Sequence, residues 1–97
     1  MYARVTSGQI QPAKMEEAIQ ITKESILPAI RQQRGLVSFT DLFDRSTGKV
    51  MVITLFETEA DMQAGMRNGF VQQQLAKLAP LIVGTPVIDS YEVLAHE

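Results

Sequence analysis

The chain has 97 residues, of which 45% are hydrophobic and 21% charged, and its formal net charge at pH 7 is −2. This length predicts a single domain over residues 1–97, and the lack of a basic stripe argues against nucleic acid and anionic membranes as partners. There is no cysteine for disulfide or thiolate chemistry, and no segment approaches the ~20 apolar residues of a membrane span. We therefore expect a soluble, cytoplasmic protein.

The first segment, residues 1–10, alternates loosely between the two faces of an extended chain and predicts a strand. Arg4 stands in the middle of this strand among apolar neighbours. One hypothesis is that its guanidinium orients an anionic or phenolic ligand, because its fork of donors suits oxyanions. The alternative is an arginine at a strand edge that pairs with Asp89 or Glu92. The sequence leaves both open.

A helix is predicted to follow from Gln11 and Pro12, because proline at the first helical position loses no hydrogen bond. Six residues recur at three- and four-residue steps and predict the side of this helix that faces the core. Pro28 interrupts the run and should kink the helix or split off a final turn. Gly35 is the expected stop. The core-facing residues are Met15, Ala18, Ile19, Thr22, Ile26 and Ile30.

Residues 36–44 and 50–57 are rich in β-branched and aromatic side chains and predict the two strands of a hairpin. The residues between them suit a three-residue loop, with Gly48 in the left-handed position that closes a type I turn with a bulge. Arg45 would then face Lys49. A slip of one residue would exchange the faces of the partner strand. The predicted pairs are Phe43 with Met51, Asp41 with Ile53 and Phe39 with Leu55.

Both faces of this hairpin carry large apolar side chains. An antiparallel sheet with one face exposed to solvent instead shows a clean alternation of apolar and polar residues along each strand. We therefore expect helices to cover one face and a second copy of the chain to cover the other. Asp41 lies on an apolar face with Phe39 and Phe43. A carboxylate there could have a raised pKa and act as a base. Alternatively, it faces solvent at the edge of the assembly that two such sheets would form, or it pairs with an arginine across a dimer.

After the hairpin, Thr58 begins a four-residue pattern that resembles a helix capping box, with Asp61 in place of the usual Glu. The helical region that follows is interrupted around Asn68 and Gly69, and Pro80 predicts that it ends or bends near residue 78. Asn68 is a candidate hydrogen-bond donor to a ligand. The alternative is that this Asn-Gly pair is simply a turn.

Residues 87–95 predict the last strand. Tyr91 in this strand could line a pocket and hydrogen-bond a ligand hydroxyl, or it could pack in the core or in a dimer contact. The resulting order is β-α-β-β-α-β. This is the ferredoxin-like motif, in which an antiparallel sheet carries both helices on one face. The fold class is therefore α+β, and the order alone says nothing about function.

Four stretches together resemble the antibiotic biosynthesis monooxygenase-like family of dimeric α+β barrels. They are MYARVT, ILPAIRQQRG, LFDRSTGKVMVITLFETEADM and SYEVL, and the resemblance extends over essentially the whole chain. It implies a homodimer whose two sheets face each other to form a barrel, with a pocket between sheet and helices. Members of known activity include enzymes that oxidise polycyclic phenols to quinones with oxygen and no cofactor. Others bind and degrade haem.

The chain departs from both active patterns of that family. Oxygenating members often place a tryptophan in the pocket, and haem-degrading members need a histidine ligand from within the fold. This chain has no tryptophan, and its one histidine, His96, is the penultimate residue. No Cys/His cluster has the spacing of a metal site. We expect neither a cofactor nor a metal.

The leading hypothesis is a pocket for a small, apolar or aromatic molecule, with cofactor-independent monooxygenase activity on phenolic or polycyclic substrates implied by the resemblance. Arg4, Asp41, Asn68 and Tyr91 are the candidate catalytic residues, and their part would be to deprotonate and orient the substrate in a dry cavity. The alternative is a non-catalytic homodimer that binds a ligand or a partner protein. A third reading is a regulatory domain of a larger machine. The sequence leaves open whether the chain is an enzyme.

Overall fold

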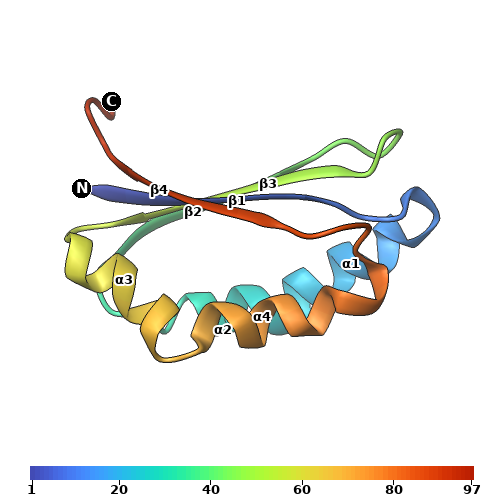
Figure 1. Cartoon of the computed structure of the whole chain (residues 1–97), viewed down its shortest axis with the longest axis horizontal. Coiled ribbons are helices and arrows are strands. Elements are labelled where there is room, and N and C mark those ends of the chain that lie inside the picture. Colours follow the sequence, from blue (N-terminus) through green and yellow to red (C-terminus); the bar gives the residue numbers. More distant parts are fainter.

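The computed structural model describes residues 1–97 as one four-stranded sheet with the helices on one of its faces (Figure 1). Every neighbouring pair of strands is antiparallel, and the strand order is β2-β3-β1-β4. The first strand of the sequence is therefore central. The predicted α+β, ferredoxin-like fold is confirmed. The strands are β1 (Tyr2–Gln9), β2 (Leu36–Phe43), β3 (Lys49–Phe56) and β4 (Val87–Glu92).

The first helical segment changes its hydrogen-bonding pattern along its length. A π-helical turn occurs just before Pro28, which has no N–H to donate to the carbonyl four residues back. The predicted interruption is confirmed: a wider turn separates the last helical turn, α2, from α1. The parts of this segment are η1 (Pro12–Lys14), α1 (Met15–Ile21), η2 (Thr22–Ile26) and α2 (Leu27–Ile30).

The second helical segment begins at a side-chain cap. Thr58 Oγ1 accepts a hydrogen bond from the Asp61 backbone N–H at 3.1 Å, as the capping pattern predicted. Gly69, with φ 81°, separates two helices at the predicted break, and the second ends two residues before Pro80. No helix has the length and apolar character to cross a membrane. The parts are α3 (Glu59–Arg67), α4 (Phe70–Leu78) and η3 (Ala79–Leu81).

The hairpin register differs by one residue from the predicted one. The loop has four residues, 45–48, because the Asp44 N–H donates to the Lys49 carbonyl at 2.9 Å and the Gly48 N–H donates to the Asp44 carbonyl at 2.8 Å. The Asp44 carboxylate also accepts from the Ser46 backbone N–H at 2.9 Å, which stabilises the longer loop. Gly48 has the predicted left-handed backbone, with φ 82°. The observed pairs are Phe39 with Thr54, Asp41 with Val52 and Phe43 with Val50.

The core lies between the helices and the inner face of the sheet, where Phe56 is completely buried. The opposite, outer face of the sheet has no helix over it (Figure 1). Four large side chains of this face are exposed, and the pairing of β2, β3, β1 and β4 places them on one surface. We call them the outer patch. They are Leu42, Met51, Val87 and Tyr91.

Candidate functional site

A cavity lies between the inner face of the sheet and the helices. It consists of two adjoining chambers of about 90 and 250 Å³. The π-helical turn supplies part of the wall through Thr22, whose hydroxyl donates to the Ala18 carbonyl at 2.8 Å. Most of the remaining lining is apolar. The five residues common to both chambers are Thr22, Phe39, Asp41, Val52 and Leu78.

Asp41 is the one carboxylate in this lining. The four-residue hairpin loop sets the register that places Asp41 beside Val52, on the face towards the helices. It forms no ion pair. Burial among apolar groups raises the pKa of the Asp41 carboxyl above its ordinary value, as its sequence context suggested. A carboxylate in such surroundings is suited to accept a proton from a bound ligand.

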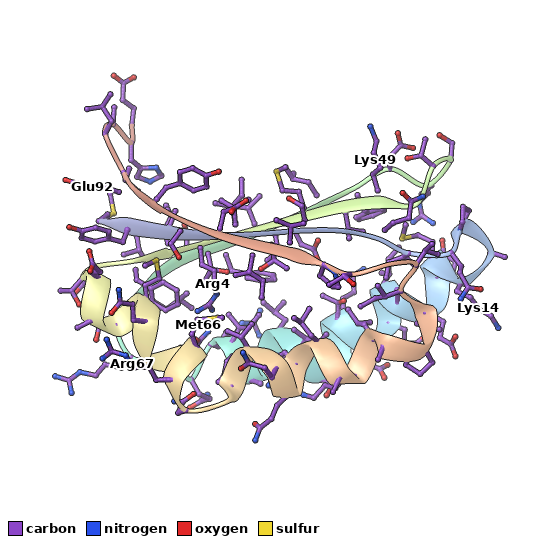
Figure 2. The ribbon with its side chains drawn as sticks, in the orientation of Figure 1. Arg4, Lys14, Lys49, Met66, Arg67 and Glu92 are labelled. Carbon is purple, nitrogen blue, oxygen red and sulfur yellow. The ribbon has the colours of Figure 1, made fainter.

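Arg4 lines the smaller chamber and is only 5% exposed. Its Nη1 donates to the Met62 carbonyl at 3.1 Å, and its Nη2 donates to Gln33 Oε1 at 3.5 Å. The guanidinium carbon also lies 5.1 Å from the centroid of the Phe56 ring. Burial lowers the pKa of Arg4 from its ordinary value. In Figure 2 the side chain extends from the sheet towards the helices.

The alternative pairing of Arg4 with Asp89 or Glu92 is wrong. Asp89 lies opposite Val5, on the outer face of the sheet, because side chains alternate along a strand. Glu92 lies opposite Tyr2, two residues beyond Ser90, which is the residue opposite Arg4, but it forms no ion pair with the guanidinium. No carboxylate forms an ion pair with Arg4. The buried positive charge of Arg4 is therefore in contact only with neutral groups, namely a backbone carbonyl, a side-chain amide and an aromatic ring.

A small residue in α3 makes room for the guanidinium. A Cβ on Gly65 would lie 3.1 Å from Arg4 Nη1 and 3.1 Å from Gln33 Oε1. Gln33 Nε2 is buried without a hydrogen-bond partner. The isolated glycine inside a helical pattern was the only sequence signal for this arrangement, because such a glycine often marks close packing. Neither Gly65 nor Gln33 was predicted from the sequence as a site residue.

The other two predicted site residues are not brought to this cavity. Tyr91 pairs with Ala3 on the outer face and is 55% exposed, so strand alternation directs it away from the helices. Asn68 Oδ1 accepts from the Phe70 backbone N–H at 2.9 Å, so its side chain acts in the turn between α3 and α4. Asn68 lines a separate, polar recess of about 270 Å³ with Gln33 and neighbouring residues.

Comparison with known proteins gives two kinds of relative. No family model matches the sequence. The uncharacterised proteins Rv2557 and Rv2558 of Mycobacterium tuberculosis H37Rv are 26% identical over 95 residues and 24% identical over 93 residues. These matches cover 98% and 96% of this chain but only 42% and 39% of the relatives. The chain therefore spans about two fifths of the length of these proteins.

Solved structures match over nearly the full length. The protein NE2512 of unknown function from Nitrosomonas europaea is 25% identical with a TM-score of 0.78, covering 99% of this chain and 91% of that one. A Deinococcus radiodurans protein assigned by name to the antibiotic biosynthesis monooxygenases is 18% identical with a TM-score of 0.80, covering 100% and 96%. A Streptomyces coelicolor monooxygenase from the gene ActVA-Orf6, solved with the ligand nanaomycin D, is 18% identical with a TM-score of 0.74, covering 99% and 89%.

Proposed function

We propose that this chain, which has the fold of the antibiotic biosynthesis monooxygenases, binds a small, largely apolar, aromatic molecule in the cavity between its sheet and its helices. The observation that carries the proposal is an apolar cavity with a single carboxylate, Asp41, set among Phe39, Val52 and Leu78. Small-molecule sites are typically apolar and contain a few polar groups that orient the ligand.

The chemistry that this site supports best is cofactor-independent oxygenation of a phenol. Asp41 would accept the phenolic proton, because its surroundings favour the protonated carboxyl. The electron-rich phenolate would then react with O2. One oxygen atom enters the ring as a quinone oxygen, and the other leaves as water with the hydroxyl and ring hydrogens. The substrate thus supplies all the electrons, and Arg4 would orient it by binding an anionic group.

The outer patch supports a second copy of the chain as the partner. Leu42, Met51, Val87 and Tyr91 form an exposed apolar surface on a sheet face without helices. Large exposed apolar side chains on an uncovered sheet face are typical of association sites. We expect sedimentation equilibrium to give twice the mass of the chain, and the variant Leu42→Glu to give the monomer mass. A monomeric wild-type protein would contradict this assembly.

Oxygen uptake with a hydroxyanthracene, without added metal or flavin, tests the chemistry. We expect one O2 consumed for each quinone formed, and about a 100-fold loss of rate in Asp41→Asn, which is typical of removing a general base. The matched control is Glu24→Gln, which removes a carboxylate from the exposed side of η2. Its rate should stay within about twofold of the wild type. Full rates in single variants of Arg4 and Asp41 would contradict the assignment of these two residues to the site.

A non-catalytic ligand-binding homodimer is the second candidate. It is favoured by the composition of the cavity, whose lining contains neither histidine nor tryptophan. In this case the protein would bind the same aromatic probes with saturation but consume no oxygen. Calorimetric titration and oxygen uptake on one preparation therefore separate the two functions.

A further inference from the structure

We infer that the natural ligand of this cavity is an aromatic acid, whose carboxylate binds the guanidinium of Arg4. This inference rests on the proposed function, because it takes the cavity as the ligand site. The observation behind it is a buried cation without a counter-charge. Arg4 is 5% exposed and forms no ion pair, whereas buried charges in proteins are ordinarily paired.

The hydrogen bonds of Arg4 leave capacity for a ligand. A guanidinium has five N–H groups, and two hydrogen bonds hold it, to the Met62 carbonyl and to Gln33 Oε1. Three N–H groups therefore remain without a protein acceptor. A carboxylate is the acceptor that matches the fork geometry of arginine best. Thr6 and Thr54 line the same chamber and add hydroxyls beside the site.

The position of Asp41 indicates the shape of the acid. Arg4 pairs with Thr54, which pairs with Phe39, and Asp41 lies two residues further along β2 on the same face. Two steps across the sheet and two along a strand separate the Cα atoms of Arg4 and Asp41 by about 12 Å. A ligand with a carboxylate at one end and a phenolic hydroxyl at the other would reach both groups.

The cavity has one other cation, which gives a control. Lys23 lines the larger chamber but is exposed, so water already solvates its ammonium group. An exposed charge contributes little to binding compared with a buried one. The acid preference should therefore depend on Arg4 and not on Lys23.

Isothermal titration at pH 7.5 with three probes tests the inference. The probes are 6-hydroxy-2-naphthoate, its methyl ester and 2-naphthol. We expect the acid to bind at least tenfold more tightly than the ester. In Arg4→Gln this preference should disappear while the affinity for 2-naphthol stays within about twofold of the wild-type value. In Lys23→Gln the preference should remain.

The outcomes separate the two levels of the proposal. Equal binding of acid and ester by the wild type, or a preference lost in Lys23→Gln instead of Arg4→Gln, would overturn the aromatic acid and leave the aromatic cavity standing. A folded wild-type protein that binds none of the probes would contradict the proposed function and the inference together. If Arg4→Gln does not fold, the wild type and Lys23→Gln still test the inference. A preference for the acid over the ester in both proteins supports it, and the lack of this preference in either protein overturns it.

Discussion

Replacing Gly65 by alanine tests how tightly Arg4 is held. Gly65 lies inside α3, and a Cβ at this position would approach Arg4 Nη1 and Gln33 Oε1 to 3.1 Å each. Such contacts are tighter than usual, so both side-chain ends must move. The hydrogen bond from Arg4 Nη1 to the Met62 carbonyl is the interaction that this movement weakens.

Two effects of opposite sign set the magnitude of this change. Alanine in a helix interior is favoured over glycine by about 1 kcal/mol. Loss of a hydrogen bond from a charged group costs about 1.5–3 kcal/mol. The net expectation is a loss of about 0.5–2 kcal/mol in the free energy of unfolding. For a domain of this size each kcal/mol shifts Tm by about 5 °C, so Gly65→Ala should lower Tm by about 2–10 °C.

Differential scanning calorimetry of a double-mutant cycle with Arg4→Met separates the two effects. The methionine side chain has no Nη1, and Gln33 is then free to move because Arg4 no longer binds it. In this background Gly65→Ala should raise Tm by up to about 5 °C, since only the helical preference remains. A rise of about 5 °C on introducing Gly65→Ala into the wild type, with no coupling to Arg4, would refute the reasoning.

Three further predictions concern the core, the hairpin and pH. Phe56→Ala removes a completely buried ring and leaves a cavity in the core. It should lower the free energy of unfolding by about 3–5 kcal/mol, which calorimetry would record as a fall in Tm of roughly 15–25 °C. A loss below about 1 kcal/mol would contradict this description of the core. Gly48→Ala places a Cβ against the Ile10 carbonyl oxygen at a residue whose φ of 82° is left-handed. Urea unfolding should therefore show that the free energy of unfolding falls by more than about 1 kcal/mol. A variant as stable as the wild type would contradict the loop geometry. Burial raises the pKa of Asp41 in the folded state, so wild-type stability falls as pH rises from the unfolded towards the folded pKa, and the loss is complete above the latter. Asp41→Asn should therefore be more stable than the wild type at pH 7 and lose this advantage in acid; a difference that does not change with pH would exclude ionisation of Asp41 as its cause.

The sequence predicted the strands and the turn glycine of the hairpin but placed their pairing one residue out of register. Both faces of the hairpin are apolar, so the hydrophobic pattern could not choose between adjacent registers. The choice is made by Asp44, whose carboxylate accepts hydrogen bonds from the backbone of Ser46 and Thr47 and so stabilises a four-residue loop. A local side-chain interaction thus decides which β3 residues share a face with Asp41.

The candidate site was predictable where a polar residue interrupts an apolar strand. Arg4 and Asp41 were identified by this signal, and both line the cavity. The sequence did not show that Tyr91 lies outside the cavity. The pairing of β4 with β1 decides which side chains of β4 face the helices, and this pairing is a long-range contact. The residues that contact the Arg4 guanidinium were not predicted, for a similar reason. Gln33 follows α2 and Gly65 lies in α3, and only the packing of these helical segments brings them to β1.

The central claim is that the cavity between sheet and helices receives an aromatic ligand, and isotope-filtered NOE spectroscopy with 2-naphthol tests it most directly. We expect contacts from the naphthol protons to the methyl groups of Ile26, Val52 and Leu78, which line the cavity. Contacts confined to Leu42 and Met51 on the outer face, or none at saturating naphthol, would contradict the claim.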